Sequence, residues 1–438
     1  MKTWKAVIIA LFAVGTLVLL SFTFRNDRKL KHRTTYRSIP KGCVFRTVMG
    51  EESSDSSFVF FTPEKALLSI ERGLNWIVKA QSQSGGWGAG SHHRQDVMDP
   101  HSVQADPATT SMVAMALLRS GSSLTAGEYS APIRSALRYI LNAVETASSQ
   151  SFNITEQTGT QIQIKLGGNI DVILTSQFLS NLLDGHLDHD PSLKARVMNA
   201  NNVCVAKIQR AQDSNGSFVG SGWAGVLQSS FATNALEAAQ GQGARVDDKA
   251  LDKAREFQKN NYDSKTGEVK TELGAGVMLY SVTGSARASA KQARRVEEEI
   301  GKARRDGRLA ANAAPTAQNL EQIGFAKDEA MKYSTAYEVY QSAKVQAQRE
   351  DVMDGFGSNG GEEFLSYLQT GESMIIGKDG EWKQWYNKMS GRLVNIQNDD
   401  GSWSGHHCIT SPVFCTATCL MILSVSNDVE KLTKLGAK

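Results

Sequence analysis

Apolar and polar positions alternate between two kinds of predicted helix along residues 62–425. Amphipathic stretches, with an apolar side chain every three or four residues, lie at about 63–81, 129–146, 191–212, 247–260 and 381–397. Stretches that are small or apolar almost all round lie at about 106–120, 169–184, 223–239, 271–284, 361–374 and 411–425. An amphipathic helix buries one face, whereas an apolar helix is buried on most sides. We therefore expect outer helices that pair with inner helices.

The long charged stretch at residues 285–350 completes this pattern if it is counted as an expanded outer element. The sequence then predicts an all-α protein, an α/α-toroid of six helical hairpins in which the inner helices form a ring inside the outer ones. Residues 285–350 are rich in helix formers of both charges, which predicts a helical insertion. Two interpretations stay open, an exposed surface hairpin and a docking arm for a partner protein.

Three predicted outer helices end in a repeated phrase, a glutamine followed four residues later by glycine and six residues later by an aromatic residue. The copies are residues 81–87, 212–218 and 397–403. Glycine permits the tight backbone that ends a helix, and the aromatic ring packs back on the wall. Repetition of this kind is an architectural signal, and we expect these residues to brace helix ends.

The copies QSQSGGW and QNDDGSW resemble the QW repeat of squalene-hopene cyclases. The chain thus resembles the terpene cyclase and prenyltransferase-β superfamily, which includes prenyltransferase and squalene oxidase repeat proteins. The resemblance covers roughly residues 62–425 and implies an α/α-barrel with an apolar ligand in its lumen, but it implies no particular activity. The D-x-D-D motif of class II cyclases and the D-D-x-x-D motif do not occur in the sequence.

Protein prenyltransferase β subunits bind zinc through an aspartate, a cysteine and a histidine. Residues 411–423, SPVFCTATCLMIL, resemble the stretch in which that family places its zinc histidine, and the corresponding position here is Cys415. Arg119 is the only basic residue within the predicted inner helices. A diphosphate in the lumen would therefore lack its counter-charges.

The amino terminus carries an apolar run at residues 6–24, between two lysines and a cluster of basic residues. The run has about the ~20 residues that a membrane-spanning helix needs. We interpret residues 1–37 as an uncleaved signal-anchor, with a cleaved signal peptide as the alternative. The body of this single-pass protein is expected on the exported, periplasmic side, because a short amino-terminal flank before an early apolar run is typical of an export signal. A cytoplasmic body is the alternative, since more basic residues follow the run than precede it. Residues 38–61 read as a linker and residues 426–438 as a tail.

Composition and charge exclude one class of partner. The chain is 41% hydrophobic, and its 48 basic and 45 acidic side chains leave a net charge of only +3. A nucleic-acid-binding protein needs a basic surface, so we expect no nucleic acid as partner.

Potential metal ligands gather in two predicted loops, one after the first copy of the repeat and one around the last. The candidate zinc ligands are His92, His93, Asp96, His406, His407, Cys408 and Cys415. Closing a ring makes the first and last hairpins neighbours, so the two loops are expected to converge. Imidazole and thiolate are good zinc ligands. The alternative is that the cysteines are small buried apolar residues and that the histidines are solvated.

Acidic residues stand near the starts of the inner helices, at Asp106, Asp171, Glu272, Glu362 and Glu363. Most are expected to cap helices. Asp171 and Glu272 are the candidate catalytic residues, because a carboxyl group in an apolar lumen has its ionisation disfavoured and can act as a general acid.

Two functional hypotheses follow. In the first, a membrane-anchored enzyme of the cyclase or prenyltransferase type, with its reaction unassigned, binds an apolar small molecule in the lumen. In the second, a non-catalytic binding or scaffold protein uses the rim and the insertion for partner proteins.

Overall fold

The computed structural model describes residues 62–437 apart from 221 and 358. All the described residues belong to one compact unit. The predicted anchor and linker lie outside the described residues. Within them the structure contains helices and three isolated β-bridges but no strand, which confirms the all-α class.

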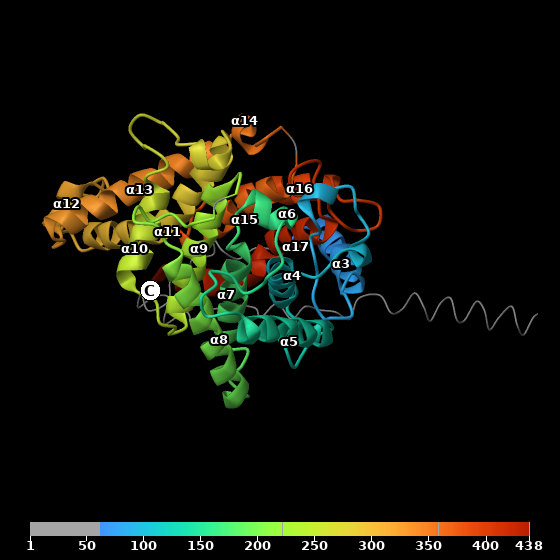
Figure 1. The fold of residues 1–438 in the computed structure, drawn as a ribbon. Helices are drawn as coiled ribbons and strands as arrows, with labels where there is room; N and C mark the ends of the chain where they lie inside the picture. The colour runs from blue at the N-terminus through green and yellow to red at the C-terminus, as the bar shows by residue number, and fades with distance from the viewer. Residues whose placement is uncertain (1–61, 221, 358, 438) are drawn as a thin grey trace, which may run out of the picture. The chain divides into compact units, whose positions relative to one another are not determined.

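The helices agree closely with the predicted pattern (Figure 1). The partly exposed helices are α3 (Glu64–Lys79), α5 (Ser130–Thr146), α8 (Pro191–Arg210), α10 (Asp248–Lys259), α13 (Lys327–Ala347) and α16 (Trp382–Asn395). The mostly buried helices are α4 (Pro107–Arg119), α7 (Ile170–Leu183), α9 (Gly225–Gly241), α11 (Met278–Arg305), α15 (Gly361–Ile376) and α17 (Pro412–Leu423). Shorter helices are α6 (Gln161–Lys165), α12 (Ala317–Gln322), α14 (Glu350–Met353) and α18 (Val429–Ala437), with 3₁₀ turns η2 (His92–Arg94), η3 (Pro100–Ser102), η4 (Glu272–Gly274) and η5 (Val425–Asp428).

Helices α3 and α4 illustrate the two kinds. In α3, Leu74 and Ile77 are buried, whereas Leu68 is 53% exposed. In α4, every residue is buried. Asp106 begins α4, because its carboxylate accepts a hydrogen bond from the backbone N–H of Thr109 at 2.7 Å. This is the N-cap that the sequence position of Asp106 predicts.

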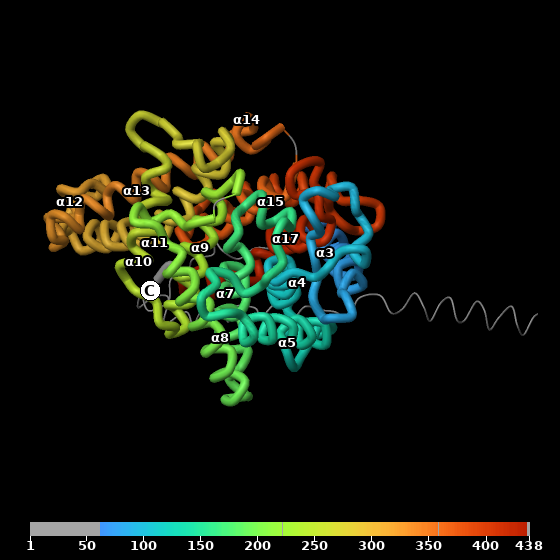
Figure 2. The backbone as a smooth tube through the Cα atoms, in the orientation of Figure 1, coloured from blue at the N-terminus to red at the C-terminus, as the bar shows by residue number. Residues whose placement is uncertain are grey.

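The buried helices contact one another in sequence order (Figure 2). Helix α4 packs on α7, α7 on α9, α9 on α11, α11 on α15, α15 on α17, and α17 returns to α4. Hydrogen bonds join their starting ends. Asp171 at the start of α7 accepts from the backbone N–H of Ala108 in α4, and Tyr280 in α11 donates to Glu363 in α15. The buried helices therefore begin at one end of the body and finish at the other.

The three repeated turns share one geometry. The Nε2 atom of Gln81 donates to the carbonyl oxygens of Gly85 (2.7 Å) and Pro132 (3.0 Å). Gln397 donates likewise to the carbonyl oxygens of Gly401 (2.8 Å) and Ser69 (2.9 Å). The second acceptor lies in α5 for Gln81 and in α3 for Gln397. Each glutamine therefore links its turn to a neighbouring outer helix by a hydrogen bond.

The insertion departs from its predicted boundary. Helix α11 runs unbroken from Met278 to Arg305, and its residues 285–290 are buried. Small residues such as Ala286 and Ala290 continue the apolar pattern there, so they extend the inner helix beyond residue 284. Helix α13 packs along α11, and Figure 1 shows α12 with the adjoining ends of α11 and α13 extending from the other helices. A separate small core that includes Ile300, Leu309 and Leu320 holds this extension together.

The segment predicted as a C-terminal tail, residues 426–438, contains most of η5 and the helix α18. Val425, Val429, Leu432 and Leu435 recur at helical spacing and bury one face. Helix α18 packs on α11 and α15. Among the described residues, no single helix has the length and apolar composition of a membrane span. Helix α17 with Val425–Leu435 meets that test only as a pair bent by 57°.

Candidate functional site

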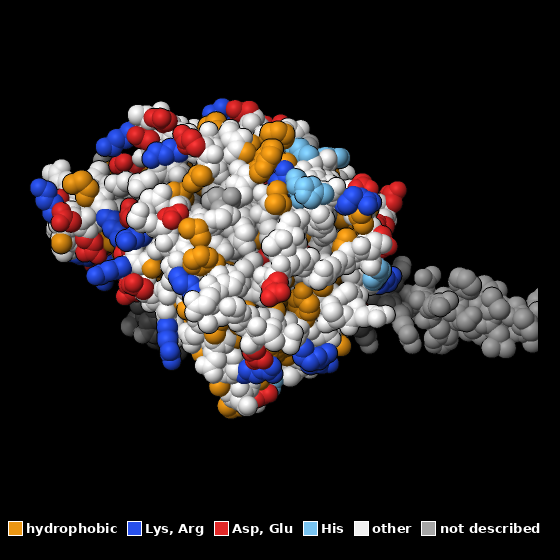
Figure 3. Space-filling model, viewed as in Figure 1, with side chains coloured by type: hydrophobic (Ala, Val, Ile, Leu, Met, Phe, Trp, Pro, Cys, Tyr) orange, Lys and Arg blue, Asp and Glu red, His pale blue; other side chains and the backbone are white. Residues whose placement is uncertain are grey.

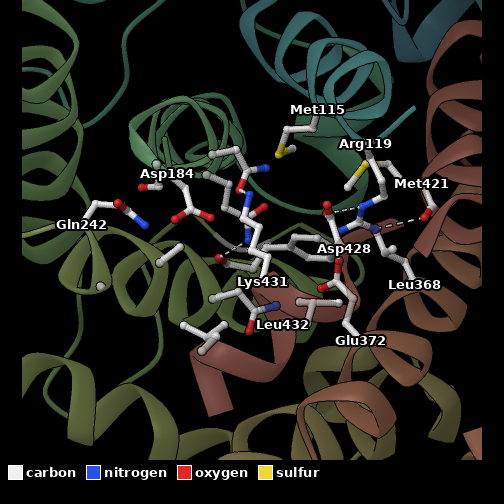
Figure 4. Close-up of a pocket in the computed structure, with 18 of the residues that line it drawn as sticks. Met115, Arg119, Asp184, Gln242, Leu368, Glu372, Met421, Asp428, Lys431 and Leu432 are labelled. Carbon is white, nitrogen blue, oxygen red and sulfur yellow. Dashed lines mark hydrogen bonds and ion pairs between the residues drawn. The ribbon is translucent and has the colours of Figure 1, made fainter. Parts of the chain in front are cut away.

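A cavity of about 120 Å³ lies where the finishing ends of the buried helices meet η5 and α18 (Figure 4). Helices α4, α7, α9, α11, α15 and α17 all contribute side chains to it. Its apolar lining includes Met112, Met115, Phe231, Leu368, Met421 and Leu432. Methionine side chains are flexible and adapt to irregular ligands. The cavity is therefore an apolar space inside the contact cycle.

Arg119, at the end of α4, is the central charge beside this cavity. Its Nε donates to Asp428 at 2.6 Å, one Nη to Glu372 at 2.7 Å and the other Nη to the carbonyl oxygen of Met421 at 3.0 Å. Burial raises the pKa of Asp428, but the positive charges of Arg119 and Lys431, together with the hydrogen bond from Arg119, outweigh burial and leave this pKa below its ordinary value. The guanidinium is thus held by two carboxylates, one from α15 and one from η5.

Three further cations line the cavity, so Arg119 is not its only basic residue. They are Arg287, Lys431 and Lys434, of which Lys434 pairs with Glu430 at 2.8 Å. Arg287 lies on the part of α11 beyond residue 284 and pairs with Glu237 at 3.0 Å. Lys431 comes from α18 and donates to the side chain of Asn181 at 2.7 Å. Each of these cations has a partner within the protein, so the cavity offers no unpaired positive charge among the described side chains.

The predicted metal-ligand loops converge at the opposite end, where the buried helices begin. The Thr410 hydroxyl donates to the carbonyl oxygen of Gln95 at 2.8 Å, which joins the last loop to the first. Histidine side chains gather on one side of the face in Figure 3, close to exposed hydrophobic side chains. The expected convergence of the two loops is therefore present in the structure.

The side chains of the first loop face other partners. The ring of His92 is hydrogen-bonded to Gln95 at 2.7 Å, and its pKa is lowered by burial and by Lys165. His93 is exposed. Asp96 is also exposed, and the Arg94 guanidinium, which contacts both of its oxygens, lowers the pKa of its carboxyl group.

The last loop spreads its donors over several environments. His406 is exposed, and the ring of His407 packs edge-on against Phe356 with centroids 5.2 Å apart. Cys408 has a left-handed backbone, with φ of 61°, and burial raises its pKa to about 11. Cys415 is fully buried and its Sγ donates to the carbonyl oxygen of Ile409 at 3.4 Å.

Burial also raises the pKa of Cys415, so its thiolate, the form that binds zinc, is disfavoured. Among the residues that the structure describes, no group of three or more His, Cys, Asp or Glu side chains is arranged to hold a metal ion. Bound zinc stays a prediction, which metal analysis of the purified protein tests.

Asp171 and Glu272 have different environments. Asp171 is fully buried, and it accepts hydrogen bonds from the backbone of Ala108 (3.1 Å) and from Gln163 (2.7 Å). Burial raises its pKa. These bonds make it a cap for the start of α4 as well as a buried acid. Glu272 is exposed in η4, because α11 begins at Met278 and not at residue 271. The expectation that Glu272 faces the lumen is therefore wrong.

Glu362 and Glu363, which the sequence analysis treated as caps, are the buried acids at the start of α15. Burial, followed by repulsion from Glu363, raises the pKa of Glu362 to about 8. Glu363 is fully buried and accepts a hydrogen bond from the hydroxyl of Tyr280 at 2.6 Å. The sequence shows two adjacent acids at a helix start, but it gives no sign that both of them are buried.

Asp428, Lys431 and Leu432 are the site residues that sequence reasoning missed. The sequence does contain a pattern that could have predicted this helix, because the apolar residues Val425, Val429 and Leu432 have helical spacing. Comparison of the chain with known protein families, with curated proteins and with solved structures gives no match. The function is therefore argued from the geometry.

Proposed function

We propose that residues 62–437 form an α/α-toroid of the terpene cyclase and prenyltransferase-β type, and that its lumen binds an apolar small molecule. The cycle of contacts from α4 round to α17 and back supports the toroid. The three turns braced by Gln81, Gln212 and Gln397 support the resemblance to QW repeats. The fold alone assigns no chemistry, so the binding proposal depends on the cavity.

The observation that carries the binding proposal is an apolar cavity of about 120 Å³ to which all the buried helices of the contact cycle contribute. Small-molecule sites are concave and mostly apolar, with a few polar groups that fix orientation. The methionine and leucine side chains supply the apolar lining, and Arg119 supplies a polar group. The cations beside the cavity are already paired, which favours binding of an apolar molecule over transfer from a diphosphate.

The reaction, if the lumen has one, is unassigned. Acid catalysis at the other end is a second candidate, because the raised pKa of Glu362 keeps its carboxyl protonated at neutral pH. The alternative to an enzyme is a binding or scaffold protein whose partner docks on the extension formed by α11, α12 and α13. The apolar run at residues 6–24 supports a single-pass anchor with the body on the exported side.

A cavity-filling variant tests the binding proposal. Ala238 lines the cavity, and Ala195 is an exposed alanine on the outer helix α8. We expect full-length protein in detergent micelles to bind N-phenyl-1-naphthylamine, a dye that fluoresces in apolar surroundings. Ala238→Trp should weaken binding at least about tenfold, since the indole occupies the ligand space. Ala195→Trp should bind like the unchanged protein, and equal binding by all three proteins contradicts a lumen site.

A further inference from the structure

Helix α18 covers the finishing end of the lumen with one apolar face. Leu432 is 6% exposed and lines the cavity together with Leu435. Lys434 and Glu430 are exposed and form an ion pair at 2.8 Å, and Lys434 also lines the cavity. An amphipathic helix in this position covers part of the cavity mouth, which stays partly open.

Polar contacts also hold α18 and the η5 turn before it. They include the Asp428 pair with Arg119, a hydrogen bond from Asn427 to the carbonyl oxygen of Arg119 at 2.9 Å, the Lys431 bond to Asn181, and a bond from Arg294 to the carbonyl oxygen of Thr433. Helix α18 has only 9 residues and ends the described chain. A helix that short is marginal alone, so packing against α11 and α15 holds it in place.

The size of the cavity indicates that α18 has to move for a ligand of ordinary size. Binding pockets usually measure roughly 300–1,000 Å³, and a cavity of about 150 Å³ takes a single benzene ring. The space of about 120 Å³ therefore accepts little while Leu432 and Leu435 occupy its open end. Displacing α18 removes both side chains and widens the opening of the cavity.

Displacement also changes the charge around Arg119. Glu372 belongs to α15 and stays, whereas Asp428 leaves with η5. The Nε–H of Arg119 would then be a donor at the lumen wall without its carboxylate, which is costly for a desolvated cation. One carboxylate of a ligand restores that bond, with its apolar chain in the space that Leu432 vacates.

We infer that α18 is a displaceable plug of the lumen, and that the Asp428 carboxylate holds the position taken by the carboxylate of a long-chain acid when α18 leaves. The ligand half of this inference rests on the proposed function. The plug itself stands on the packing of α18 alone. Glu372 and Asp184 beside the site disfavour a ligand with several negative charges, so a monocarboxylate fits better than a diphosphate.

A reporter cysteine tests the plug without any ligand. Ser180 lines the cavity and is 1% exposed, and its hydroxyl accepts a hydrogen bond from Asn201 of α8, so Ser180→Cys places a buried thiol in the wall of the lumen. Labelling by N-ethylmaleimide is followed for this cysteine and for Cys204, which is fully buried and reports unfolding. Leu432→Asp should drive α18 off and speed labelling of residue 180 at least tenfold relative to Cys204. Leu68→Asp, at an exposed position of α3, is the matched control.

Equal slow labelling in Leu432→Asp and in the control overturns the plug. Parallel acceleration at residue 180 and at Cys204 means global unfolding. The second variant, Asp428→Asn, removes one of the two carboxylates on Arg119 without placing a charge in the lumen, and it should also raise the labelling ratio. Failure of both variants to raise that ratio likewise overturns the plug.

Fluorescence of cis-parinaric acid and of its methyl ester tests the carboxylate. Full-length protein should bind the acid at least tenfold more tightly than the ester. The double variant Arg119→Met/Asp428→Asn removes both charges of the pair and should bring the two affinities together. The double variant Arg196→Met/Glu145→Gln, at an exposed ion pair of 2.7 Å, is the control.

The outcomes separate the two proposals. Binding of acid and ester with equal affinity overturns the carboxylate assignment and leaves the apolar lumen site standing. Selective labelling at residue 180 without binding of either probe or of the naphthylamine dye supports the plug and contradicts the proposed function.

Discussion

Gln397, at the end of the last outer helix, donates a hydrogen bond of 2.9 Å to the carbonyl oxygen of Ser69 in the first one. The same Nε2 atom bonds the carbonyl oxygen of Gly401 at 2.8 Å. One amide group thus ends α16 and joins it to a helix 328 residues earlier in the chain. A contact of this kind stabilises only a closed arrangement of helices.

Gln397→Ala should lower the free energy of unfolding by about 1–3 kcal/mol, because two carbonyl oxygens lose their donor in a partly buried place. Gln397→Glu should cost at least as much, since a carboxylate faces the same two oxygens and donates to neither. Urea unfolding followed by circular dichroism measures both variants. A loss below about 0.5 kcal/mol in both would show that water replaces the amide.

Glycine is required at the turn that Gln397 braces. Gly401 has φ of 97°, and a Cβ there would lie 2.8 Å from the carbonyl oxygen of Arg72. Gly401→Ala should therefore lose about 2 kcal/mol or more. Gly391 lies in α16 with open space around it, so Gly391→Ala should gain about 0.5–1 kcal/mol. Thermal unfolding of the two variants gives the comparison, and equal effects contradict the geometry of the turn.

The order of helices was predictable because burial leaves a periodic pattern in the sequence. Helix α4 is buried on every side and α3 on one, and both patterns can be read directly. The boundary at residue 285 was not predictable, since α11 changes from a fully buried helix to a charged one without a break. A charged residue that favours helices, such as Arg287, can occur in a buried helix or in an exposed one. Only the ion pair with Glu237 shows that Arg287 lies in the interior.

The candidate site was less predictable than the fold. The convergence of the first and last loops follows from ring closure, and the bond from Thr410 to Gln95 agrees with it. Ring closure does not predict the direction in which each side chain points. Asp96, for example, forms an ion pair with Arg94 of its own loop and not with a residue of the other loop. Local pairs of this kind form without any contribution from the rest of the fold.

Two deletions distinguish the extension from the ring. Replacing residues 300–330 with a short Gly-Ser loop removes α12 and its small core, and the cut ends are near each other because Arg295 contacts Tyr333 and Glu329. This variant should keep one cooperative unfolding transition. Replacing residues 285–350 removes buried parts of α11 and α13 and should abolish that transition. Calorimetry measures both, and a cooperative transition in the longer deletion contradicts the place of α11 in the interior.

The stability of the body should fall as the pH rises from about 4.5 to about 8, since the pKa of Glu362 is raised from its ordinary value to about 8 in the folded chain. Below the ordinary pKa the carboxyl is protonated in both states, and above about 8 it is ionised in both. Between these limits the folded chain holds a proton that the unfolded chain releases, so raising the pH favours unfolding. The charged and titratable groups around Glu362 include Glu363, which raises its pKa further, and Lys165, which opposes the shift.

Glu362→Gln isolates this contribution, because the amide keeps an oxygen for the backbone N–H of Ile409, which now donates to Glu362 at 3.3 Å. The variant should match the unchanged protein near pH 4.5 and exceed its free energy of unfolding by on the order of 4 kcal/mol at pH 8.5. Some slope remains in the variant, since burial also raises the pKa of Asp106, to about 7. Glu145→Gln, at an exposed carboxyl whose pKa Arg196 lowers, should show no such gain with pH. A difference between Glu362→Gln and the unchanged protein that stays constant across this range would mean that Glu362 is ionised in the folded chain.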